Sequence, residues 1–131
     1  MMPVAIHGEV VSRKRKEGRD RFQAISIPCN ETSEATRLVG ELADRHGLGT
    51  ASHLSWAARS GTGNSIAEAK SDGGESGAGN CILDVMRKKG VANRLVLVAR
   101  WYGGRHLGPR RFRIYRGLAM EVSNPSGGTT P

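Results

Sequence analysis

The sequence has few aromatic residues, few cysteines and no long apolar run. Aromatic residues make up 5% of the 131 residues, which leaves few rings for stacking on nucleic-acid bases. The two cysteines, Cys29 and Cys81, form no metal-ligand pattern, so we expect free thiols in a reducing cytoplasm. No signal-like segment is visible, and no apolar stretch approaches the ~20 residues of a membrane-spanning helix. We therefore expect a cytoplasmic protein without a membrane partner.

Acidic residues are missing from one long stretch of the chain. From Arg87 to Arg116 there are ten basic residues and no Asp or Glu. A second basic cluster, Arg13 to Lys16 with Arg19 and Arg21, lies near the start, and the formal net charge is +8. Such a field attracts RNA, acidic protein surfaces and other polyanions without selecting among them.

The length fits one domain, which we place at residues 1–122, followed by a polar tail at 123–131 that is expected to be disordered. Hydrophobic periodicity predicts strands at 4–11, 21–27, 51–59 and 95–99, and helices that begin near residues 35, 77 and 109. The glycine-rich segment 61–79 is expected to be mainly loop, with a short strand near 66–69 as an option. This order predicts an α+β fold, a two-layer sandwich of about four mainly antiparallel strands with three helices on one face. The other face would be open, and we expect a monomer.

The central stretch combines a strand, a glycine turn and a helix start. Leu95 to Ala99 is an unbroken apolar run, typical of a strand buried on both faces, and Pro109 suits the first turn of a helix. Arg110 and Arg111 then lie where the helix dipole disfavours cations by roughly 0.3 to 1 kcal/mol each. Two interpretations stay open, an anion- or partner-binding site and a solvated basic face. The candidate residues of such a site are Arg100, Trp101, Tyr102, Arg105, Arg110, Arg111 and Arg113.

Helical spacing sorts the side chains of the last helix. Its core positions would be Phe112, Tyr115, Leu118, Ala119 and Val122. Arg110 and Arg113 would then point away from the core, while Arg111 would reach back toward neighbouring loops. Trp101 and Tyr102 adjoin the arginines and are the best aromatic candidates for contact with a partner.

Two carboxylates, Asp72 and Glu75, precede a helix start in a glycine-rich loop. Glu75 with Ser76 could cap that helix, or the two acids could act as an acid/base pair or hold a divalent ion. An ion pair to Arg100 or Arg111 is a further option. Two carboxylates alone make a weak metal site, and His53, on the strand face predicted to lie off the core, has no recognisable catalytic partner. We favour a structural role for this loop and expect no catalytic residue, metal or cofactor.

The segment Arg100-Trp-Tyr-Gly-Gly-x-x-Leu-Gly-Pro-x-Arg-Phe112 resembles the IMPACT family, the eukaryotic relatives of bacterial YigZ-type proteins. The strand that begins Ala51-Ser-His53 and the loop Ser71-Asp72-Gly-Gly-Glu75 resemble the family's Ala-Thr-His and Asp-Asp-Gly-Glu motifs. The similarity covers nearly the whole chain. Gly73 and Arg110 each stand where the family usually has an aspartate.

The resemblance implies a ribosomal protein S5 domain 2-like fold and a non-enzymatic role in translation control. Eukaryotic members restrain the starvation response by binding the ribosome-associated activator of the kinase that phosphorylates initiation factor 2. The expected partner is therefore a ribosome-associated translation-control protein. Direct binding of RNA or the ribosome is the alternative, since bacterial relatives have been suggested to bind nucleic acid, and a hydrolytic enzyme is a distant third. The family's RWD and ferredoxin-like domains lie outside the resemblance.

Overall fold

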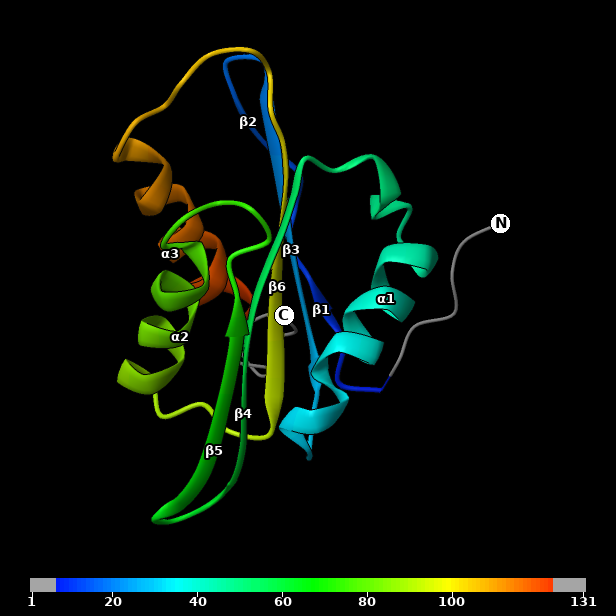
Figure 1. The fold of residues 1–131 in the computed structure, drawn as a ribbon, viewed down its shortest axis with the longest axis vertical. Coiled ribbons are helices and arrows are strands. Elements are labelled where there is room, and N and C mark those ends of the chain that lie inside the picture. Colours follow the sequence, from blue (N-terminus) through cyan, green and yellow to red (C-terminus); the bar gives the residue numbers. More distant parts are fainter. Residues whose placement is uncertain (1–6, 124–131) are drawn as a thin grey trace.

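A computed structural model describes residues 7–123 of the chain. Six strands form one sheet: β1 (Val10–Val11), β2 (Arg15–Glu17), β3 (Asp20–Pro28), β4 (His53–Thr62), β5 (Ser65–Ser71) and β6 (Arg94–Trp101). Three helices pack on it: α1 (Ala35–Arg45), α2 (Ala78–Lys88) and α3 (Arg110–Ser123), with short 3-10 turns at Thr32–Glu34 and Leu48–Thr50 (Figure 1). The α+β class with a mainly antiparallel sheet and three helices is confirmed. Ser123, which was assigned to the predicted tail, is instead the buried last residue of α3. Residues 124–131 of that tail lie outside the described residues, as do positions 4–6 of the first predicted strand.

Strand β6 lies at the centre of the sheet. The order is β1-β3-β6-β4-β5, with β2 paired to β3, and every pairing is antiparallel. The sheet has more strands than the four predicted, because β2 forms within the charged segment that was expected to be a loop. The option of a strand near 66–69 is confirmed and extends to all of β5. Both are exposed strands at the periphery, where charged residues replace the apolar alternation that reveals a buried strand.

The helices cover both faces of the sheet. Figure 1 shows α2 and α3 on one side and α1 on the other, so the prediction of three helices on one face with the opposite face open is wrong. In β6, Val96 and Val98 pack into the cluster formed with α2 and α3, whereas Leu95 and Leu97 pack into the cluster formed with α1. A strand that is apolar on both faces needs cover on both, and α1 supplies the second layer.

Strand β4 is also buried on both faces. Leu54 and Trp56 pack toward α1, while Ala57 belongs to the cluster under α2 and α3, and Ser55 is fully buried. The face that carries His53 and Ser55 was expected to lie off the core, but α2 and its preceding loop cover it. This arrangement brings His53 next to the carboxylate loop.

The core face of α3 differs from the prediction at Phe112 and at Ile114, which is buried although it was not among the predicted core positions. Tyr115, Leu118, Ala119 and Val122 are buried as predicted, but Phe112 is only partly buried. Its ring leans toward α2, where Gly77 leaves room: a Cβ on Gly77 would lie 3.3 Å from the ring. No helix among residues 7–123 has the length and apolarity needed to cross a membrane.

Candidate functional site

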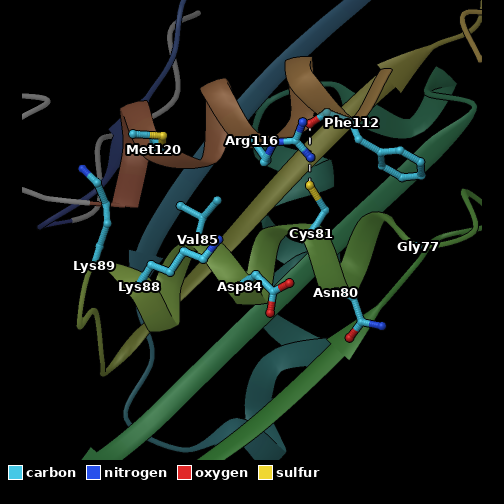
Figure 2. Close-up of a pocket in the computed structure, with 10 residues that line it drawn as sticks. All are labelled: Gly77, Asn80, Cys81, Asp84, Val85, Lys88, Lys89, Phe112, Arg116 and Met120. Carbon is cyan, nitrogen blue, oxygen red and sulfur yellow. Dashed lines mark hydrogen bonds between the residues drawn. The ribbon is translucent and has the colours of Figure 1, made fainter. Parts of the chain in front are cut away.

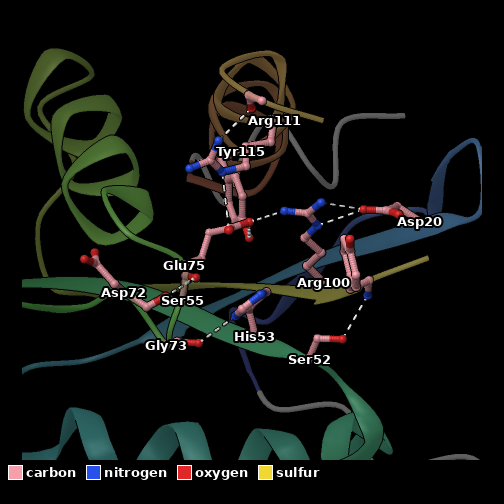
Figure 3. A network of polar contacts seen from close by, with 12 residues as sticks. Asp20, Ser52, His53, Ser55, Asp72, Gly73, Glu75, Arg100, Arg111 and Tyr115 are labelled. Atoms are coloured by element: carbon pink, nitrogen blue, oxygen red, sulfur yellow. Dashed lines mark hydrogen bonds and ion pairs between the residues drawn. The ribbon is translucent and has the colours of Figure 1, made fainter. Parts of the chain in front are cut away.

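Arg100, at the end of β6, lies in a buried network of charged side chains (Figure 3). It is 3% exposed, and its two carboxylate partners, Asp20 and Glu75, are also buried. Nε and Nη2 of Arg100 donate to Oδ2 of Asp20 at 2.9 and 2.6 Å, and Nη1 donates to Oε1 of Glu75. Burial alone would lower the pKa of the Arg100 guanidinium, but the bonds to Glu75 and Asp20 outweigh it and raise that pKa. Arg100 is therefore a fixed internal cation with very little solvent exposure.

Glu75 contacts two further side chains. The Tyr115 hydroxyl donates to Oε1 at 2.9 Å, and Nε of Arg111 lies 3.3 Å from Oε2. Burial and the negative charge of Glu75 raise the pKa of Tyr115, which keeps its hydroxyl protonated. The predicted option of ion pairs to Arg100 and Arg111 is confirmed for both arginines. Glu75 is therefore held by two arginines and a tyrosine, with its Oε1 accepting from Arg100 and Tyr115.

Asp72 orders the start of α2. Its Oδ2 accepts from the amide of Gly77 at 3.1 Å and its Oδ1 from the amide of Gly79 at 2.8 Å. These two bonds lower the pKa of the Asp72 carboxyl. The capping role was expected from Glu75 and Ser76, but Asp72 performs it, since Glu75 turns inward to Arg100.

The cap makes a testable contribution to stability. The pKa of Asp72 is lower in the folded state, so its contribution is fully present above about pH 4, the unfolded value, and is lost as the pH falls through the folded pKa. Asp72→Ala should lower the free energy of unfolding by about 1 kcal/mol at pH 7. In urea titrations at several pH values, the gap to the parent chain should close as the pH falls below 4. Asp44→Ala, at an exposed carboxylate in α1, is the control. A stability difference between Asp72→Ala and the parent chain that stays constant with pH would contradict the prediction.

His53 lies beside this network and has a defined tautomer. Its Nδ1 is 3.0 Å from the carbonyl oxygen of Gly73, and because a carbonyl only accepts, Nδ1 carries the proton. His53 lines a cavity of about 370 Å³ with His106 and Tyr102 on its walls and Arg100 and Arg111 among its lining side chains. Within residues 7–123, no three His, Cys, Asp or Glu side chains are grouped so that they could hold a metal ion.

Trp101 and Tyr102 point to opposite sides of the sheet. Trp101 packs against the α1 cluster, its Nε1 donates to Oγ1 of Thr50 at 3.0 Å, and Arg21 lies over its ring. Tyr102 is exposed on the other side, with its ring centroid 5.9 Å from that of His106. The pair is therefore not a single aromatic platform, and Tyr102 is the more exposed of the two.

Five arginines from the two basic clusters meet at one end of the molecule. Arg15, Arg110 and Arg113 line a hollow of about 220 Å³, and Arg19 and Arg105 line another of about 460 Å³. The β2–β3 hairpin and the loop before α3 lie side by side in Figure 1. We call these residues, Arg15, Arg19, Arg105, Arg110 and Arg113, the basic surface. Arg110 and Arg113 point away from the core as predicted, whereas Arg100 and Arg111 belong to the internal network.

Asp20 is the residue of the network that sequence reasoning missed. It is 1% exposed, and its second oxygen, Oδ1, accepts from the amide of Gly103 at 2.7 Å. The available signal was a single acid between Arg19 and Arg21, followed directly by a strand. Such an acid in a basic segment is a candidate partner for a buried arginine, but it lies 80 residues from Arg100 in the chain.

Most of the chain matches one known protein family. The model of the Impact N-terminal domain matches residues 18–123. The chain belongs to this family. "Protein IMPACT-B" of Xenopus tropicalis is 32% identical to this Impact domain over 123 residues, which is 92% of the chain and 38% of the frog protein. "IMPACT family member YDL177C" of Saccharomyces cerevisiae is 40% identical over 62 residues, 47% of the chain and 36% of the yeast protein.

Solved structures share the fold of the Impact domain. One, described as the "two-domain translational regulator Yih1", superposes with a TM-score of 0.62 at 26% identity and covers 91% of this chain and 47% of that one. A second, a crystal structure of a hypothetical protein, has a TM-score of 0.67 at 24% identity and covers 96% of this chain and 56% of that one, which shows the fold alone. The chain spans about two fifths of the length of the frog relative.

Proposed function

We propose that this Impact domain is a non-catalytic binding module in translational regulation. The carboxylates of its motif loop, Asp72 and Glu75, are both engaged in internal contacts. In contrast, Arg110 and Arg113 are exposed, and neither takes part in an ion pair of residues 7–123. The observation that carries the proposal is this contrast between carboxylates held in internal contacts and exposed arginines without an ion pair among residues 7–123. The description of Yih1 as a translational regulator supports the context.

The partner proposed is an acidic patch on a ribosome-associated translation-control protein. In the finer form of the proposal, that protein is the activator of the initiation factor 2 kinase, and binding restrains the kinase. Among residues 7–123, Tyr102 is the one strongly exposed aromatic side chain, which is too few for a platform that stacks several bases. The basic surface therefore fits a protein patch better than single-stranded RNA.

Charge reversal on the basic surface tests the proposal. The double variant Arg110→Glu with Arg113→Glu should reduce recovery of ribosome-associated proteins in affinity pull-downs from native cytosol by on the order of tenfold, because like charges then face the partner. Recovery by the parent chain should survive nuclease treatment. Lys70→Glu, at an exposed cation of β5, is the matched control and should leave recovery unchanged. Equal recovery by the double variant and the control would contradict the proposal.

Direct binding of RNA is the second candidate, and the convergence of five arginines on one surface is the observation that favours it. If the surface neutralises phosphates, log affinity for single-stranded RNA should fall linearly with log salt, with a slope of about −0.7 per contact. Each replacement of Arg110 or Arg113 should then flatten the slope by about one contact. Tight RNA binding at physiological salt that collapses in these variants would favour RNA over a protein partner. A turnover abolished by Asp72→Asn or Glu75→Gln would instead favour an enzyme.

A further inference from the structure

A second surface, distinct from the basic surface, lies between α2 and α3. The two helices run side by side, and a groove of about 470 Å³ opens between them on the side away from the sheet (Figure 2). Its lining includes Cys81 and Val85 of α2 and Phe112, Arg116 and Met120 of α3. Met120 is 51% exposed, more than any other large hydrophobic side chain of residues 7–123, and Phe112 is partly exposed. The groove therefore presents apolar surface that no described part of the chain covers.

The spacing of the lining residues gives the groove its direction. On α3 they recur every four residues, at 112, 116 and 120, and on α2 they include 81, 85 and 88, with Gly77 just before its first residue. Both sets follow one side of a helix, so the groove runs along the helix axes for about 12 Å, or roughly two turns. Such a shape matches another helix laid lengthwise, with one apolar side chain per turn directed into the groove.

The rim of the groove is basic. Arg116, Lys88 and Lys89 line it, and the one acid among the lining residues is Asp84, which already lies 3.4 Å from Arg87. No ion pair of residues 7–123 includes Arg116, Lys88 or Lys89. The segments outside the described residues, 1–6 and 124–131, contain no Asp or Glu side chain that could neutralise these cations. These exposed cations are therefore available to the carboxylates of a partner.

We propose that the α2–α3 groove is a docking site for an acidic amphipathic helix of a partner protein. Its apolar stripe packs on Phe112, Val85 and Met120, and its carboxylates face Arg116, Lys88 and Lys89. Arg110 and Arg113 lie on the opposite flank of α3, beside β2, so one helix of this domain separates two surfaces. The groove proposal does not depend on a role in translation or on the identity of the partner of the basic surface.

A model peptide tests the groove directly. The probe is a helix-forming peptide of about 16 residues with leucine once per turn and glutamate at most other positions. A matched peptide carries lysine in place of glutamate. Binding is followed by NMR of methionine methyl groups, because Met120 lines the groove whereas Met86 is fully buried and serves as an internal reference. We expect the acidic peptide to shift the Met120 methyl and the lysine peptide to leave it unchanged.

Two charge reversals on the same helix separate the groove from the rest of α3. Arg116→Glu should weaken binding of the acidic peptide by on the order of tenfold, and Arg113→Glu should leave it within about twofold. Both side chains are exposed, so both variants should fold; the dispersion of their amide spectra checks this. The proposal is overturned by the absence of a Met120 shift at millimolar acidic peptide, by equal shifts with the lysine peptide, or by equal weakening in both variants. An apolar compound that binds while the acidic peptide does not would also overturn it.

Discussion

Replacement of Arg100 by methionine is expected to lower the free energy of unfolding by about 3 to 5 kcal/mol. The guanidinium is almost fully buried and holds Asp20 and Glu75, both of which are buried as well. Methionine fills much of the same volume but leaves two carboxylates without their shared cation. The cost comes mainly from these uncompensated charges in a site that water reaches poorly.

Urea denaturation of the two chains at neutral pH measures this loss. Arg105→Met is the matched control: Arg105 is exposed, and its replacement should change stability by about 0.5 kcal/mol or less. Combining Arg100→Met with Asp20→Asn and Glu75→Gln removes both carboxylate charges and should recover part of the loss. A decrease below about 1 kcal/mol for Arg100→Met would show that the network contributes little to stability.

Gly73→Ala should cost about 2 to 4 kcal/mol, because it combines backbone strain with a steric clash. Gly73 has a φ of +59°, and a Cβ at this position would lie 2.1 Å from the carbonyl oxygen of Leu54. The Leu54 carbonyl belongs to the backbone and cannot turn aside as the end of a flexible side chain could, so the loop around Gly73 must move.

Gly18→Ala is a control matched in backbone angle. Gly18 also has a φ of +59°, but a Cβ there would meet no atom within 4 Å. Its replacement should therefore cost only the strain of the left-handed conformation, about 1 kcal/mol. The difference between the two variants in thermal or urea unfolding isolates the clash with Leu54. Equal losses would mean that the loop around Gly73 shifts freely.

Local sequence patterns predicted the elements better than their arrangement. The apolar run of β6 and the helical spacing of α2 and α3 are contained in short windows, so strand and helix could be assigned from them. The side of the sheet that α1 covers depends on the connection from β3 and on both faces of β6 and β4. The apolar run at Leu95 to Ala99 already implied two covered faces, which conflicted with the prediction of one open face. A prediction that covered both faces of this strand would have placed α1 on the face opposite α2 and α3.

Three arginines of the basic surface, Arg105, Arg110 and Arg113, were among the candidate residues, whereas Arg15 and Arg19 were not. The sequence showed which arginines lie near the start of α3, and helical spacing separated Arg110 and Arg113 from Arg111. The sequence could not show that Arg100 forms a buried ion pair with Asp20, because this contact joins β3 and β6 across 80 residues. The β3–β6 pairing places the β2–β3 hairpin beside the loop before α3. This pairing brings Arg15 and Arg19 close to Arg105 and Arg110, and it too could not be read from local sequence.

The two oxygens of Asp20 fix the spacing between the parts of the basic surface. Oδ2 holds Arg100 at the end of β6, and Oδ1 holds the amide of Gly103 in the loop that follows, while Asp20 itself begins the second strand of the β2–β3 hairpin. The hairpin and the loop are thereby joined at one buried carboxylate. The conformational entropy of fixing the hairpin and the loop relative to each other is lost when the chain folds. A partner therefore does not have to order them when it binds. A partner that contacts Arg19 and Arg105 together meets a preorganised surface, and loss of Asp20 would weaken association even though its carboxylate never touches the partner.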